Sequence, residues 1–167
     1  GLSFYALLAL LVGLLQDGAP EWVRAGAPRR ATGLFLVLVS AAFGLLWLGQ
    51  ILPALLSGRD PAGLSDIGLL TNPVHVLDLS LLLPALAVTG VSLLRGRGLG
   101  SALAPVMLGF NVFMPLAIAG MVVVMQARGI GGGLGLAIVT TGIAVVSAAL
   151  LVGFLGHVDD GRPAVAR

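Results

Sequence analysis

A histidine and an aspartate three positions apart form the pair of residues best suited to proton transfer or cation binding. His75 and Asp78 stand in the stretch Thr-Asn-Pro-Val-His-Val-Leu-Asp. Asn72 is a good N-cap and Pro73 suits a first helical position, so a helix should begin here and carry both side chains on one face. An imidazole that titrates near neutrality beside a carboxylate can relay a proton or hold a cation. The alternative interpretation is a hydrogen-bonded clip between helices near a helix N-terminus.

Further polar side chains are predicted inside long apolar segments. Four of them should lie at about the depth of the histidine–aspartate pair or near the same rim: Gln50, Gln126, Thr140 and Thr141. Residues that converge at one depth are what an outward-facing polar pocket requires, although scattered polar residues that only pack helices fit equally well. Asn111 is expected near mid-depth between Pro105 and Pro115. Prolines free backbone carbonyls, so this segment is similar to the discontinuous helices of transporters, or is shaped for packing alone.

Other chemistries find no support in the residue pattern. The chain has no cysteine, and its two histidines, His75 and His157, are predicted at opposite membrane surfaces, so neither a thiolate site nor a shared haem or metal site is expected. Gly131, Gly132 and Gly133 are followed by no Lys-Ser/Thr pair and preceded by no strand, so they form no phosphate loop. We therefore expect no catalytic residue, no metal site and no enzyme. Whether lipid, quinone or pigment is bound stays open.

The elements that position these residues follow from composition. Apolar residues make up 58% of the 167 residues and charged residues 10%. About 20 apolar residues cross a ~30 Å hydrocarbon core as a helix, and the apolar runs are continuous rather than alternating. The sequence thus predicts an all-α polytopic transmembrane helix bundle, a single domain over 1–167. Its five predicted helices are 2–16, 32–56, 73–94, 101–126 and 134–156, the first of which is too short to span and is expected to continue upstream.

Arginines predict the orientation of these helices. Seven of the nine fall on one side of the predicted alternation, and Arg59 and Arg128 fall on the other. The positive-inside rule then places the C-terminus in the cytoplasm. The excess of arginine over acidic residues is explained by membrane orientation and by anionic lipid head groups, so a nucleic acid partner is not expected.

The stretch from Asn72 to Asp78, followed by an apolar run that contains Pro84, resembles a pattern in uncharacterised multi-pass inner-membrane proteins of high-GC bacteria. The resemblance covers the third and fourth predicted helices. It implies a location in the bacterial inner membrane and no activity, and no site residue is transferred from it.

Two functions are consistent with the sequence. The first is a non-catalytic integral membrane subunit or scaffold of a larger bacterial membrane complex, with the lipid bilayer and other membrane subunits or further copies as partners. The alternative is a small proton-coupled transporter or channel with an outward-facing polar site at His75 and Asp78. Both interpretations place Asp78 inside the bundle, and only the second requires a hydrated route to it.

Overall fold

The computed structural model describes residues 23, 26–58, 72–129 and 133–158, together with residues 6, 9, 10, 12 and 13. Most of the predicted helix 2–16 lies outside the described residues. Where the chain is described, it is helical apart from turns and a single antiparallel bridge between Val23 and Val158.

Four helical segments are long and apolar enough to cross a membrane. In chain order, the elements are α2 (Arg29–Leu56), α3 (Pro73–Leu77), the π-helical turn η2 (Asp78–Leu82), α4 (Leu83–Leu94), α5 (Gly98–Ala127) and α6 (Leu134–Leu155). The elements α3, η2 and α4 form one continuous membrane-length segment, Pro73–Leu94. The predicted all-α transmembrane bundle is confirmed, and the ends of four predicted helices agree to within three residues.

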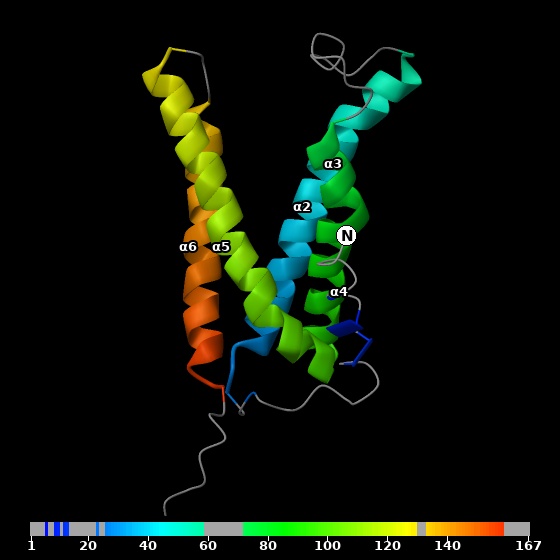
Figure 1. The fold of residues 1–167 in the computed structure, drawn as a ribbon, viewed down its shortest axis with the longest axis vertical. Helices are drawn as coiled ribbons and strands as arrows, with labels where there is room; N and C mark the ends of the chain where they lie inside the picture. Colours follow the sequence, from blue (N-terminus) through cyan, green and yellow to red (C-terminus); the bar gives the residue numbers. More distant parts are fainter. Residues whose placement is uncertain are drawn as a thin grey trace, which may run out of the picture.

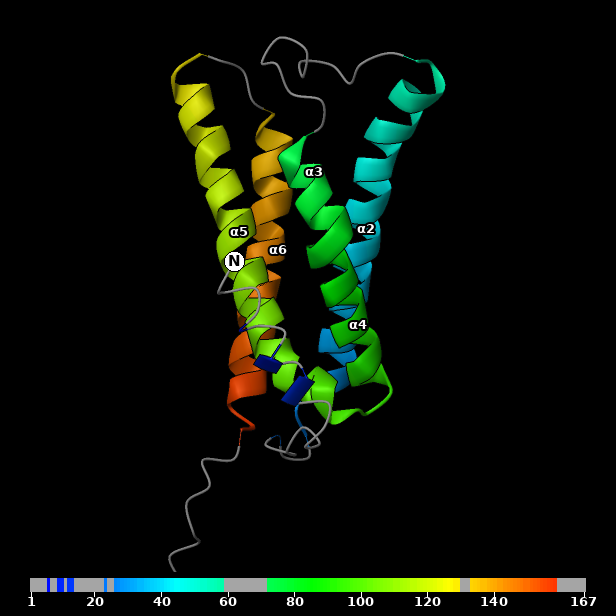
Figure 2. The ribbon, with the colours of Figure 1, turned by 45° about the vertical axis from the view of Figure 1, so that its right-hand side comes forward.

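The helices form two antiparallel pairs. One pair is α2 with the segment from α3 to α4, and the other is α5 with α6. Figures 1 and 2 show that the pairs meet where α2 begins, where α4 turns into α5 and where α6 ends. We call this the closed end. Toward the opposite end, where α2 and α5 finish, the pairs diverge, and we call it the open end.

One face of α2 with a seven-residue spacing makes the contact with the segment from α3 to α4. Gly33 lies against Gly90, where a Cβ on either glycine would come within 2.9 Å or less of the other's carbonyl oxygen. One heptad further along α2, the Ser40 hydroxyl donates to the Leu83 carbonyl at 2.8 Å. After another heptad comes Trp47. A seven-residue repeat is the signature of left-handed helix packing, and its smallest member sets the closest approach of the two backbones.

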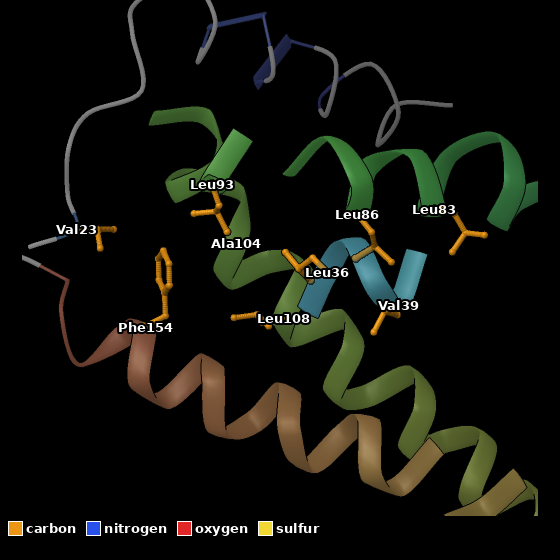
Figure 3. Packing of buried hydrophobic residues seen from close by; sticks show 9 residues of the cluster. All are labelled: Val23, Leu36, Val39, Leu83, Leu86, Leu93, Ala104, Leu108 and Phe154. Carbon is orange, nitrogen blue, oxygen red and sulfur yellow. The ribbon is translucent and has the colours of Figure 1, made fainter. Parts of the chain in front are cut away.

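The main core lies toward the closed end. Figure 3 shows side chains from α2, α4, α5 and α6, with Val23, packed together. The nine buried members of this cluster are Val23, Leu36, Val39, Leu83, Leu86, Leu93, Ala104, Leu108 and Phe154. A smaller cluster of Ala119, Val122 and Ala137 joins α5 to α6 nearer the open end. The large cluster therefore connects the two pairs, whereas the small one belongs to a single pair.

The described helices contain one irregular turn, and it stands directly before a proline. The sequence pointed to Pro105 and Pro115, yet α5 is one helix of 30 residues that contains both. The irregular turn is η2, directly before Pro84. Proline has no N–H to donate, and its ring presses on the carbonyl four residues back in an α-helix. A wider turn at this point removes that crowding.

Candidate functional site

His75 and Asp78 lie together against α2, and a tryptophan joins them. The indole N–H of Trp47 donates to Oδ2 of Asp78 at 3.0 Å. The Trp47 and His75 rings stack with their centroids 4.3 Å apart and an interplanar angle of 36°. Both members of the pair are half-buried. We call Trp47, His75 and Asp78 the tryptophan cluster.

The local backbone of the tryptophan cluster follows the predicted start of the helix. The Asn72 side chain accepts a hydrogen bond from the Val74 N–H at 3.0 Å, and Pro73 takes the first helical position. Asp78 then begins η2, and its carbonyl accepts from the Leu83 N–H, five residues later.

The π turn decides which face of α3 meets α2. A π turn holds one residue more than an α turn, so the residues before it are rotated by about 100° relative to a regular helix. Counting back from Leu83 at α-helical spacing, Leu79 and Val76 would face α2. With the extra residue, Asp78 and His75 take that face, while Val76 and Leu77 are exposed. The π turn therefore delivers both polar side chains to Trp47.

Sequence reasoning missed Trp47. In an apolar run, a tryptophan is an ordinary membrane residue, and its indole N–H needs a partner only when it is buried. The available signal was its heptad spacing from Gly33 and Ser40, the two small residues of α2 that meet the neighbouring segment. Its pairing with Asp78 depends on the π turn, for which the sequence offers no comparable pattern.

The other predicted polar residues divide between the two helix pairs. Thr140 is buried between α5 and α6, and its hydroxyl donates to the Leu136 carbonyl at 2.8 Å, whereas Thr141 is exposed. Gln126 is exposed at the end of α5, and Gln50 is exposed on α2. The structure thus places Thr140, Thr141 and Gln126 on one pair, and Gln50 with the tryptophan cluster on the other.

Asn111 is buried at 4% exposure inside the bundle. Its amide donates to the Met107 carbonyl at 3.0 Å, one turn back on α5. Ser147 on α6 does the same with the Ile143 carbonyl at 2.7 Å. Side chains that return to their own helix in this way satisfy their polar groups locally. Each of these bonds therefore stays within a single helix.

The tryptophan cluster has the chemistry of an interhelical clip, with one carboxylate oxygen already hydrogen-bonded. Trp47 contacts the face of the His75 ring, whereas the two ring nitrogens form hydrogen bonds in the plane of the ring, so this contact does not use them. The second oxygen of Asp78 is also an acceptor. Within the described ranges, no group of three or more His, Cys, Asp or Glu residues is arranged to hold a metal ion.

No protein family model, curated protein or solved structure matches this chain.

Proposed function

We propose that this chain is a non-catalytic integral membrane subunit or scaffold that assembles with further membrane helices, from other copies or from other subunits. The observation that carries the proposal is the exposure of Gln50 on a face of α2 that is buried nearer the closed end. The proposal extends to a bacterial inner membrane complex with the C-terminus in the cytoplasm, as the arginine distribution indicates.

Gln50 continues a heptad series along α2. Leu36 is fully buried, Phe43 is half-buried and Gln50 is exposed, and successive members lie seven residues apart on one side of the helix. Burial decreases along this series in the direction in which the two helix pairs diverge (Figure 1). Gln50 therefore lies on the face of α2 that the pair of α5 and α6 covers only near the closed end.

An amide at this position favours a helix over a lipid chain as its neighbour. Gln50 lies six residues before the end of α2, about 9 Å along the axis. A carboxamide cannot hydrogen-bond to hydrocarbon, whereas Gln side chains do bond across membrane helices, and small residues let a partner approach. Gly49 is adjacent, and a Cβ there would meet nothing within 4 Å, so this chain's own packing leaves room beside it.

The experiment replaces Gln50 with Leu in the full chain and measures mass in mild detergent by light scattering. Expected is a loss of the higher-order species and a mass equal to one chain with its detergent. Ala41→Leu is the matched control, because Ala41 is exposed on the opposite side of the same helix. The control variant should keep the assembly of the unmodified chain.

Two outcomes would overturn the assignment to an assembly subunit. One is a single-chain mass for the unmodified protein, both in mild detergent and when extracted with its native lipid. The other is a lower unfolding temperature for Gln50→Leu with no change in assembly, which would mean that a segment of the same chain covers this face.

Proton-coupled transport at His75 and Asp78 remains the second candidate. The π turn favours it, because π turns occur frequently at functional sites and this one directs both ionisable side chains to one face. In liposomes, transport predicts a pH-gradient-driven flux that Asp78→Asn abolishes while the fold and the assembly persist. Flux that is absent from the unmodified protein, or unchanged in Asp78→Asn, counts against transport.

A further inference from the structure

A cationic surface lies at the closed end. Arg30 lies in the first turn of α2, and Arg95 and Arg97 lie in the turn between α4 and α5; all three are exposed. Contact of Gly33 with Gly90 places these two helix ends at the same level, about one turn beyond the crossing. We call Arg30, Arg95 and Arg97 the arginine surface. Arg29 is not part of it, because its guanidinium turns inward and donates to the Val23 carbonyl at 2.7 Å.

No carboxylate faces the arginine surface from the part of the chain that the structure describes. The single acidic side chain in that part is Asp78, and it bonds to Trp47 toward the open end. The sequence flanking the closed-end helix termini adds Asp17, Glu21, Asp159 and Asp160. Counted along the sequence, the helix termini at the closed end and the segments that flank them contain seven arginines, three more than these four acidic residues. In the sequence that follows α2 and α5, the two arginines Arg59 and Arg128 are matched in number by Asp60 and Asp66.

The residues beside the arginine surface are aliphatic and also exposed. Arg30, Leu34 and Leu38 follow one another at four-residue spacing along α2, and Leu34 and Leu38 are 54% and 66% exposed. This face lies away from the side on which Gly33, Ser40 and Trp47 meet the neighbouring segment. A guanidinium at the end of an apolar stripe matches a molecule with an anionic head and hydrocarbon chains, since Arg pairs well with phosphate.

We propose that the arginine surface binds the phosphate groups of anionic phospholipids, whose acyl chains lie along Leu34 and Leu38. This interaction is independent of assembly through Gln50. Each arginine near an anionic membrane surface contributes about 1 kcal/mol, which is about fivefold in affinity. Removal of all three charges should therefore reduce binding to anionic lipid by well over tenfold.

The test is native mass spectrometry of the full chain with phosphatidylglycerol and phosphatidylcholine of matched acyl chains. The unmodified protein should retain more phosphatidylglycerol, and Arg30→Gln/Arg95→Gln/Arg97→Gln should retain both lipids equally. Arg128→Gln is the matched control, because Arg128 is an exposed arginine at the open end. It should keep the preference of the unmodified chain.

Three results would overturn the proposal. They are an unchanged preference in the triple variant, an equal loss in Arg128→Gln, and complete displacement of phosphatidylglycerol by inorganic phosphate at matched ionic strength. The last result would identify a site for free anions. Circular dichroism and elution volume show whether each variant is folded. If the triple variant aggregates, the single variants Arg30→Gln and Arg95→Gln replace it. Each should lose about fivefold in affinity for phosphatidylglycerol, and an unchanged affinity in both would overturn the proposal.

Discussion

At the scale of single residues, the tryptophan cluster shows how an ionisable side chain is accommodated at membrane depth. Asp78 receives a hydrogen bond from a neutral donor on another helix, and His75 covers the ring that supplies it. Removal of one partner of a buried hydrogen bond leaves the other partner unsatisfied, at a cost of about 1–3 kcal/mol. The cluster therefore holds α3 against α2 near the open end, beyond the nine-residue core.

Replacing Trp47 with Phe tests this bond. The variant keeps an aromatic ring for His75 to stack against and removes only the N–H donor, so the free energy of unfolding should fall by about 1–3 kcal/mol. Asp78→Asn keeps an acceptor oxygen and should cost less. Thermal unfolding in detergent, followed by circular dichroism, measures both changes. Equal stability of Trp47→Phe and the unmodified chain would show that the indole bond adds nothing.

At the scale of elements, the π turn is the feature on which the site depends. It inserts one residue between Asp78 and Leu83. Both residues are hydrogen-bonded to α2, Asp78 by the Trp47 indole and Leu83 by the Ser40 hydroxyl. A deletion of one residue within the turn should leave Asp78 and His75 four and seven positions before Leu83. Those are the α-helical spacings for one face. The same deletion in a regular helix would rotate everything on one side of it by about 100°.

Deletion of Leu81 in a Pro84→Ala background is the corresponding experiment, because Leu81 is exposed and the alanine removes the ring that an α turn would crowd. The deletion should unfold within a few degrees of its Pro84→Ala parent. Deletion of Val88, an exposed residue of α4, should be much less stable in the same assay. If both deletions are equally damaging, the π turn does not set the register.

Sequence patterns predicted this fold well and the site in part. The four described membrane helices follow from uninterrupted apolar length, and the start of α3 follows from Asn72 and Pro73, because these signals are local. The partner of Asp78 could not be predicted, since it depends on contact between helices and on a one-residue change in helical phase. Convergence in depth was equally insufficient to place Thr140, which the structure buries between α5 and α6.

At the scale of the whole molecule, the arrangement of helices places helix ends from α2, α4, α5 and α6 at one surface. The start of α2, the turn between α4 and α5, and the end of α6 all lie at the closed end (Figure 2). The bridge between Val23 and Val158 joins the segments that flank α2 and α6 there. The arginines beside these ends make the two surfaces of the molecule electrically unequal.

Single cysteines test this layout cleanly, because the natural sequence has none. Arg95→Cys and Arg128→Cys stand at exposed positions on opposite ends of the bundle. In intact cells, a membrane-impermeant maleimide should label Arg128→Cys and should label Arg95→Cys only after lysis. Labelling of both from the outside would contradict the membrane-spanning arrangement, and the reverse pattern would invert the orientation.

The large shared core near Phe154 and Leu108 gives the two helix pairs the geometry of a lever. Beyond Leu108, α5 continues for 19 residues to Ala127, about 28 Å along its axis. A tilt of about 5° about Leu108 would displace the far end of α5 by about 2.5 Å over that length. A small change in the packing of a few core side chains would therefore alter the spacing between the two helix pairs at the open end. A further helix bound between the pairs would be displaced by that change.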